Sequence, residues 1–596
     1  NIRSILTYMK NFLKIVAATL IGSLIAMLAG FFLFMGFISS LASFTESKTP
    51  VVPSSAVMAL NFSPAITEQS VEDPFSSLNP FSSETSKSSG ILEFVQTIDR
   101  AASDPRIKFI YMNVNQVNAG ISHIEEIREA LIRFRESGKP VIAYADNYSQ
   151  GAYYLASVAD KVYLNPAGTA TLTGLSMSPL FFKDLLDKTG VEVQLIRHGK
   201  FKAAAEQFIS NKMSEENKEQ LQAYISSVWN GWTQAISESR GIPAEKIDLL
   251  ADNLELANAK DVLDAGLVDE LLYKDQLTKN LVNLFGVEEE KDLKIISSSA
   301  YSKASKKTDF KQKNKVAVLY ANGDIIMGKS DENIASDTFQ ELISKINKDS
   351  TIKAVVLRVN SPGGSAQSSD IIERELALLR ENKPVVVSMG DYAASGGYWI
   401  ASNADKIFTG NSTLTGSIGV FSMVINAQKA MNKHLHIYSN SVNTNKHSDI
   451  MSGYRPLNNE EIEFIRGGVE EIYSDFIELV SKGRAISIEG VDSVGQGRIW
   501  SGADALKIGL ADEKGGLVDA INSAAAMAGI ENWRLVEYPV IKSQMDKLLE
   551  TFSEMESSAK VISSPELLIE KAYKSLKRES GVKNFARLPF NVEIAL

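Results

Sequence analysis

The stretch "DYAASGGYWIASNADK" (391–406) has a near copy in the first half of the chain, "DNYSQGAYYLASVADK" (146–161). Eight of the 16 aligned positions are identical without a gap, at an offset of 245 residues. Upstream, at the same offset, "IKFIYMNVN" (107–115) matches "IKAVVLRVN" (352–360). A repeat of this period has the size of a domain, so the sequence predicts a duplicated domain rather than a solenoid.

Each copy has the same local pattern of strands and helices. In the second half a β-branched run ends in a Gly-rich turn, "AVVLRVNSPGGS" (354–365), and an amphipathic helix follows. Another apolar strand, "PVVVSM" (384–389), leads into a turn and a second helix. This alternation predicts α/β domains with mainly parallel sheets and flanking helices, in which ligands bind at the carboxyl ends of strands. The loops 360–365 and 390–397 lie at such ends.

Composition excludes several classes of function. A chain of 596 residues is too long for one ordinary core, and its net charge of −10 argues against nucleic-acid binding. The absence of cysteine rules out disulfides, thiol catalysis and thiolate metal sites. The five histidines show no metal-ligand spacing, so we expect neither a metal nor a cofactor.

The N-terminal region contains a long apolar run. Residues 15–44 carry no charge, and a helix needs about 20 apolar residues to cross a bilayer. Arg3, Lys10 and Lys14 precede the run, which predicts a cytoplasmic N-terminus and export of the bulk of the chain. The run is therefore interpreted as a transmembrane anchor. The alternative is a cleaved signal peptide, for which "SLAS" (40–43) offers a small-residue cleavage site.

Changes in composition suggest the domain boundaries. One Ser- and Pro-rich stretch precedes the first copy, and a charged, Ser/Lys-rich stretch separates the two copies. The expected order is a cytoplasmic segment (1–14), the anchor (15–44), a linker (45–90), the first repeat (91–285), a second linker (286–314), the second repeat (315–540) and a C-terminal helical extension (541–596).

Ser395 is the candidate nucleophile of the second half. A serine at a strand-to-helix turn presents its hydroxyl away from the sheet, and the N–H groups of the first helical turn, here that of Gly396, have no acceptor within the helix. Such N–H groups, with those of Gly363 and Gly364 in the "SPGGS" loop, can hold an oxyanion. In the first half Gln150 takes the place of the serine and the loop glycines are missing, which predicts a site in the second half only.

The base that would activate Ser395 is not evident nearby. No histidine lies in a recognisable catalytic context, whereas a buried lysine loses its charge more readily and can act as a general base. Two lysines stand out: Lys202 in "HGKFKAAAEQF" (198–208) and Lys446 in "VNTNKHSDIMS" (442–452). The repeat makes their positions roughly equivalent, and the residue pattern does not choose between them.

Four motifs together support a family resemblance. "NSPGGS", "GDYAASGGYWIAS", "TLTGSIGVFS" and "GKFKAAAEQF", in a tandem duplication behind an apolar run, resemble the long form of the signal peptide peptidase A (protease IV) family. The resemblance covers nearly all of the chain after that run. It implies tandem ClpP/crotonase-like domains, a Ser–Lys dyad and a homotetramer on the outer face of the cytoplasmic membrane.

The resemblance also implies roles for single residues. Ser395 matches the family's nucleophile, and Lys202 matches the lysine that the long form takes from its first half to act as general base. Ser417 matches the serine that orients the lysine amine. The short form of the family carries its lysine near the position of Lys446, which stays open as the alternative base.

The function that follows is a serine endopeptidase anchored in the inner membrane, with most of the chain on the periplasmic side. It would degrade signal peptides left in the membrane after cleavage, so its expected partners are peptides, the membrane and further copies of itself. Two alternatives use the same fold: another acyl-transfer enzyme, and a non-catalytic membrane scaffold.

Overall fold

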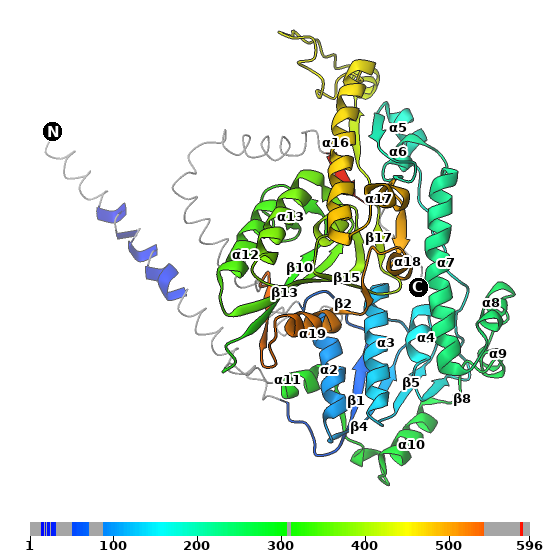
Figure 1. The fold of residues 1–596 in the computed structure, drawn as a ribbon. Coiled ribbons are helices and arrows are strands. Elements are labelled where there is room, and N and C mark those ends of the chain that lie inside the picture. The colour runs from blue at the N-terminus through cyan, green and yellow to red at the C-terminus, as the bar shows by residue number, and fades with distance from the viewer. Residues whose placement is uncertain are drawn as a thin grey trace. The chain divides into compact units, whose positions relative to one another are not determined.

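The computed structural model describes residues 14–16, 18–19, 21–23, 25–30, 50–70, 88–306, 311–541 and 584–587. The chain forms two compact units, which meet in sequence between Val52 and Pro53. In the first unit the described residues between 14 and 30 are helical. All the sheets and the candidate site belong to the second unit (Figure 1).

The structure contradicts the predicted single-pass location in the inner membrane. Among the described residues, no helix has both the length and the apolar character needed to cross a bilayer. The described helical stretch ends at Gly30, and residues 31–44 of the apolar run lie outside the described residues. The prediction rested on a run of 30 uncharged residues, of which the structure describes a helix only in the first part.

The first sheet has six strands in the order β8-β6-β5-β4-β1-β9, and every neighbouring pair is parallel. Its central strands are nearly continuous apolar runs because both faces are buried, as is typical of parallel sheets. The strands are β1 (Ala56–Asn61), β4 (Ile107–Asn113), β5 (Val141–Ala145), β6 (Lys161–Leu164), β8 (Glu270–Leu271) and β9 (Ile295–Ser297).

The second sheet repeats this order as β20-β16-β15-β13-β10-β21, and a branch from β15 leads to β17 and β19. Only the β17–β19 pair is antiparallel. The shared order of the two sheets is the structural form of the sequence repeat. The strands are β10 (Lys315–Asn322), β13 (Ile352–Ser361), β15 (Val385–Ala394), β16 (Lys406–Thr409), β17 (Leu414–Gly416), β19 (Ile499–Ser501), β20 (Glu513–Lys514) and β21 (Arg534–Tyr538).

Helices cover both faces of the second sheet (Figure 1). On one face Leu319 and Leu357 pack with the apolar sides of α12 (Ser336–Lys348) and α13 (Ala366–Arg380). On the other face Val318 and Val356 pack against α19 (Leu517–Met527). Successive strand residues point to opposite faces, so each strand contributes to both cores. The fold prediction, mainly parallel sheets with flanking helices, is confirmed.

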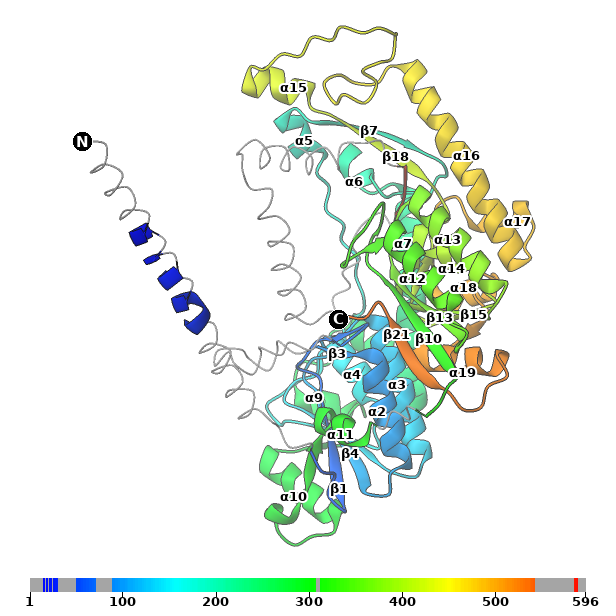
Figure 2. The same ribbon diagram turned by 90° about the vertical axis from the view of Figure 1, so that its left-hand side faces the viewer.

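A third sheet joins the two halves, in the order β12-β11-β14-β22-β18-β7. Its β7 belongs to the first half and pairs antiparallel with β18 of the second half, so these strands lie side by side (Figure 2). The strands are β7 (Glu192–Arg197), β11 (Ile325–Ile326), β12 (Ile334–Ala335), β14 (Gly363–Ser365), β18 (Phe421–Asn426) and β22 (Asn584–Arg587); β2 (Ile66–Thr67) and β3 (Ser89–Gly90) form a separate pair.

The helices connect these strands. Those of the first half are α2 (Ile91–Ser103), α3 (Ile121–Glu136), α4 (Gln150–Ala156), α5 (Lys183–Thr189), α6 (Glu206–Ile209), α7 (Glu215–Arg240), α8 (Ala244–Asp252), α9 (Ala259–Asp264), α10 (Lys274–Phe285) and α11 (Ser298–Ser305). Those of the second half are α12 (Ser336–Lys348), α13 (Ala366–Arg380), α14 (Gly396–Ala401), α15 (Gln428–Ala430), α16 (Asn459–Arg484), α17 (Ile488–Val494), α18 (Gly502–Lys507) and α19 (Leu517–Met527).

Both segments that the sequence suggested as linkers contribute to the first sheet. Strand β1 lies within 45–90, and β9 lies within 286–314. Both pair in parallel with neighbours of that sheet, so the fold of the first half extends beyond residues 91–285. The expected helical extension at 541–596 lies outside the described residues, apart from Ile541 and strand β22.

Candidate active site

Ser395 lies between the end of β15 and the start of α14. Its side chain is fully buried, and its backbone has φ 55° and ψ −117°, a conformation that non-glycine residues rarely adopt. The Ser395 N–H donates to the Gly416 carbonyl at 2.8 Å, which holds this turn against β17. The strand and the helix therefore fix the direction of the hydroxyl.

Lys202 lies in the loop that follows β7 of the first half, and its amine reaches Ser395 across the junction of the halves. Its side chain is buried, although lysine is almost never buried without a partner. The Nζ atom lies 2.7 Å from Ser395 Oγ, 3.0 Å from the Ser417 carbonyl oxygen and 3.0 Å from Ser417 Oγ. The structure thus brings together three residues that the sequence analysis proposed for one site.

Burial favours the neutral form of the Lys202 amine. It lowers the pKa of this amine well below the ordinary 10.5, because the surroundings do not solvate its charged form. A neutral amine has two N–H groups and one lone pair. One N–H donates to the Ser417 carbonyl and the other can donate to Ser417 Oγ. The lone pair is then available to the Ser395 hydroxyl.

Ser417 follows β17 directly, and its own backbone is also in the left-handed region, with φ 49°. Its N–H donates to the Arg498 carbonyl at 2.7 Å. Strand β17 pairs with β15 through Gly416 and Ala394, which places Ser417 next to the turn that carries Ser395. Adjacent strand ends therefore hold the two serines together.

Of the glycines of the candidate oxyanion site, Gly364 lies where chain segments approach closely. A Cβ at Gly364 would lie 2.0 Å from the Ile325 carbonyl oxygen. Gly396 begins α14, where an N–H has no acceptor within the helix. Gly363 differs, because its N–H already donates to Ser361 Oγ at 3.1 Å.

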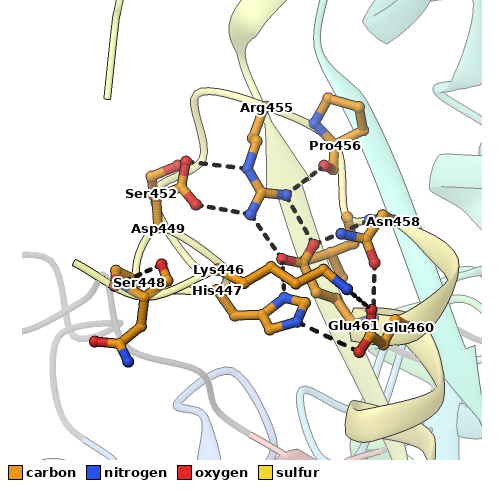
Figure 3. A network of polar contacts seen from close by, with 12 residues as sticks. Lys446, His447, Ser448, Asp449, Ser452, Arg455, Pro456, Asn458, Glu460 and Glu461 are labelled. Atoms are coloured by element: carbon orange, nitrogen blue, oxygen red, sulfur yellow. Dashed lines mark hydrogen bonds and ion pairs between the residues drawn. The ribbon is translucent and has the colours of Figure 1, made fainter. Parts of the chain in front are cut away.

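Lys446, the alternative base, takes part in a different network (Figure 3). Its side chain is 69% exposed and forms an ion pair with Glu460. Beside it, Arg455 binds both Asp449 and Glu461, with N–O distances of 2.8 and 2.7 Å. This amine is therefore held at a solvated loop, whereas the amine of Lys202 is held at Ser395.

In the first half of the chain, the side chain of Gln150 fills the position equivalent to the Ser395 turn and bonds to a neighbouring loop. Gln150 is buried, and its Oε1 accepts the N–H groups of Thr173 and Gly174 at 3.0 and 3.1 Å. Its Nε2 donates to the Gly174 carbonyl at 3.0 Å. The glutamine thus binds the loop "LTG" (172–174), the counterpart of the loop that precedes Ser417.

Three residues that the sequence analysis did not find hold the backbone around Lys202. Arg197 donates to the Lys202 carbonyl at 2.7 Å, and Gln220 Nε2 donates to the Phe201 carbonyl at 3.0 Å. The Oε1 atom of Gln220 accepts the N–H of Ile499 in the second half at 3.1 Å. A Cβ at Gly497 would lie 2.5 Å from Lys202 Cβ. A glutamine on a helix and a lone glycine carry no sequence signal for such a role.

A buried charge network lies at the junction of the halves. Arg358 is fully buried and contacts Glu68 at 2.8 Å and Glu126 at 2.7 Å. His123 contacts Glu68 at 2.9 Å. Burial opposes the charge of Glu68, but Arg358 and His123 outweigh it and lower its pKa to about 2. Burial also opposes the charge of His123, but Glu68 and Asp391 outweigh it and raise its pKa to about 9.

Residues 133–288 and 377–531 match the model of peptidase family S49. Protease 4 of Haemophilus influenzae is 39% identical over 452 residues, 72% of this chain and 72% of that protein. Protease 4 of Salmonella typhi is 36% identical over 79% of this chain and 77% of that protein. The chloroplastic serine protease SPPA of Arabidopsis thaliana is 32% identical over 72% of this chain and 64% of that protein.

The two family matches fall one in each half, in agreement with the duplication of the sequence and of the sheet order. The relatives span most of the chain and are proteases by name. The resemblance inferred from the motifs is thereby confirmed. The chain is a serine peptidase that belongs to peptidase family S49.

Proposed function

We propose that Ser395 is the nucleophile of this peptidase and that Lys202, from the other half, is its general base. The observation that carries the proposal is the 2.7 Å contact between Lys202 Nζ and Ser395 Oγ in a buried site. A general base has to lie within hydrogen-bond reach of the proton that it removes, with a pKa near the working pH. The lowered pKa of Lys202 agrees with this requirement in direction.

The first half of the reaction forms an acyl-enzyme. The lone pair of neutral Lys202 takes the hydroxyl proton of Ser395 while Oγ bonds to the peptide carbonyl carbon. The tetrahedral oxyanion collapses, the C–N bond breaks, and the Lys202 ammonium gives its proton to the leaving amine. Ser417 accepts N–H groups of the amine through its carbonyl and hydroxyl oxygens, and so keeps the lone pair directed at Ser395.

The second half of the reaction releases the acyl group. Water gives a proton to Lys202 as its oxygen bonds to the ester carbonyl carbon, and the C–Oγ bond then breaks as Oγ regains the proton. The oxyanion of both steps is held by the N–H of Gly396 and by the glycine loop 363–364. Within that loop, Gly363 would first have to release Ser361 Oγ, so Gly396 is the principal donor in this proposal.

The finer substrate assignment is part of the same proposal. The substrates are signal peptides already cleaved from exported proteins, bound in extended form beside the strands at the site. The motif resemblance and the name SPPA of one relative support this assignment. The proposal also includes the ClpP/crotonase fold for both halves and a homotetramer, for which light scattering would give four times the 65.2 kDa of one chain.

The test is hydrolysis of a peptide ester and of a synthetic signal peptide by the intact chain and by Ser395→Ala. We expect the variant to lose activity by about 10³-fold or more, because removal of the nucleophile leaves only binding and oxyanion stabilisation. Ser412→Ala, which alters a buried serine bonded to Glu125, is the matched control and should retain activity. Full activity of Ser395→Ala would disprove the assignment and would favour another acyl-transfer mechanism.

A further inference from the structure

The loop of residues 495–498, between α17 and β19, contacts the segments of both residues that flank the nucleophile. The Gln496 carbonyl accepts the N–H of Phe201, the residue before the proposed base, at 3.0 Å. Two residues further on, the Arg498 carbonyl accepts the N–H of Ser417 at 2.7 Å. The position of this loop is therefore transmitted to the lysine and to the serine that orients its amine.

Gln496 is held in a strained backbone conformation. Its φ is 55°, which a residue other than glycine keeps only where the surrounding structure imposes it. Its N–H donates to Tyr473 Oη at 3.2 Å, and its side-chain amide donates to Asp492 Oδ1. A Cβ at Gly199 would lie 2.4 Å from the Gln496 carbonyl oxygen, so the loop and the lysine segment fit closely. Side chains of α16 and α17 thus hold the residue that carries this contact.

Tyr473 reaches the segment of Lys202 in two ways. Its buried hydroxyl donates to Asp492 Oδ1 at 2.6 Å and accepts the N–H of Gln496. Burial, with the bond to Asp492, raises the pKa of this phenol above its ordinary 10, so both bonds persist at the working pH. Its ring stacks on His198, the first residue after β7, with 3.7 Å between the ring centroids.

The equivalent position in the first half carries Trp229. It is the fifteenth residue of α7, as Tyr473 is of α16, and both helices have 26 residues. The indole N–H donates to Asp248 at 2.7 Å, and in each half the aspartate lies 19 residues after the aromatic residue. An indole N–H only donates, whereas a hydroxyl donates and accepts. The bond to aspartate is common to both halves, but the second bond, to Gln496, requires tyrosine.

We propose that Tyr473 is a positioning residue, which holds the backbone beside Lys202 so that the amine stays in place for proton transfer. The hydroxyl acts through Gln496 on Phe201, and the ring acts on His198. The inference rests on the proposed function, because it takes Lys202 to be the general base. A residue that only tied α16 to α17 would need no more than the bond that the tryptophan of the first half makes.

The first test is the kinetics of Tyr473→Phe, which removes the hydroxyl and keeps the ring. Because a displacement of about 1 Å can cost about 10²-fold, we expect the loss of one bond to lower kcat by about tenfold. KM should stay within about twofold, since the base moves and the strands beside the site do not.

Tyr301→Phe is the matched control. Tyr301 is also buried, and its hydroxyl donates to Asp104 at 3.0 Å in the first half. Both substitutions therefore remove one hydroxyl bonded to an aspartate, but the control should keep the kcat and KM of the parent chain. Equal kinetics of the two variants would overturn the inference.

A pair of substitutions at Asp492 decides the question if Tyr473→Phe does not fold. Asp492→Ala leaves the Tyr473 hydroxyl and the Gln496 amide without their acceptor, and should lower kcat by about fivefold. Asp492→Asn keeps an acceptor oxygen for these donors and should recover most of the loss. A kcat of Asp492→Ala equal to that of the parent chain would contradict the proposal.

A double-mutant cycle separates this inference from the proposed chemistry. Single-turnover acylation by a p-nitrophenyl ester is measured for Tyr473→Phe, for Lys202→Ala and for the double variant. If Tyr473 acts through Lys202, its substitution should cause no further loss once the amine is absent. A further tenfold loss in the double variant would overturn the inference and leave the dyad intact. Full activity of Lys202→Ala would instead refute the proposed base, and this inference with it.

Discussion

The two halves of the molecule use the same turn for different purposes. In the second half the turn after β15 carries Ser395, with strained backbone and a hydroxyl at the Lys202 amine. In the first half the start of α4 carries Gln150, which binds the loop of its own half at Thr173 and Gly174. The strands and the strand order around the two turns agree.

This difference shows that the fold does not require a serine at the turn. A glutamine satisfies the same loop with three hydrogen bonds and stays buried. Each half has retained one component of the proposed dyad, since Lys202 comes from the half that carries Gln150. The junction between the halves thereby becomes part of the site, and changes there should affect chemistry as well as stability.

The largest expected effect comes from substitution of the proposed base, Lys202. Lys202→Ala should reduce kcat/KM by about 10³-fold or more, since Lys202 alone among the described residues places an amine at Ser395 Oγ. Lys446→Ala should stay within about twofold, because an exposed ion pair contributes little. Steady-state hydrolysis of a peptide ester measures both. Full activity of Lys202→Ala would show that the halves do not share a site.

The next effect concerns the buried charges at the junction. Arg358→Met leaves Glu126 without its cation and Glu68 with His123 alone, and should lower the free energy of unfolding by about 3–5 kcal/mol. Asn113 stands at the position of the first half that is equivalent to Arg358, so only the second copy supplies an arginine to this network. Urea unfolding gives the value, with Arg466→Ala, an exposed pair, as control. Similar values for both variants would contradict the prediction.

The rate of the reaction should also be sensitive to the packing of Gly497 against Lys202. Gly497→Ala places a Cβ 2.5 Å from Lys202 Cβ at a residue with φ 79°, so the lysine backbone has to shift. A displacement of about 1 Å of a catalytic group can cost about 10²-fold in rate. Gly468→Ala on α16 meets open space and serves as control. If kcat is equal in the two variants, the position of the lysine backbone does not limit the reaction.

Lys202→Met should reveal how much stability the chain loses by burying an amine that is protonated in the unfolded state. The pKa of Lys202 in the folded chain lies well below its ordinary value of 10.5. At a pH between the folded pKa and 10.5, the unfolded chain binds the proton and the folded chain does not. Stability of the parent chain therefore rises with pH in this window, and the Met variant gains most at low pH. Unfolding midpoints measured from pH 6 to 10 test this. A difference that widens towards high pH would have the wrong sign.

The smallest effect is expected at Gln150, the first-half counterpart of Ser395. Gln150→Ser should lower the free energy of unfolding by about 1–2 kcal/mol, because Thr173 and Gly174 lose a buried acceptor. It should not create a second nucleophile. The double variant Gln150→Ser, Ser395→Ala is the critical sample, and it should be as inactive as Ser395→Ala. Activity in this double variant would mean that the first half still contains a working site.

Local patterns were enough to predict the duplication, the parallel sheets and the serine. A strand followed by a turn and a helix is encoded by neighbouring residues, so comparison of the copies isolated Ser395 and Gln150. The choice of lysine was different, because Lys202 and Ser395 are 193 residues apart and the residue pattern left Lys446 open. Only the family resemblance favoured Lys202 before the structure placed its amine.

The inner-membrane location was predicted wrongly, because an uncharged run in a sequence does not by itself specify a helix of the required length. The residues that hold Lys202 had no signal at all. Gln220 resembles any other helical glutamine, and its bonds to Phe201 and Ile499 appear only when the halves meet. Hydrogen bonds between distant segments leave no periodic trace in a sequence.

By itself the sequence determined the repeat, the alternation of strands and helices within each copy and the turn that presents Ser395, since these follow from hydrophobic period and local turn chemistry. Tertiary structure alone decided that the Lys202 amine is buried at Ser395 and Ser417, and that β22 lies between β14 and β18. The physical reason is that burial and pairing depend on which distant segments share a boundary. That boundary exists only after both halves have folded against each other.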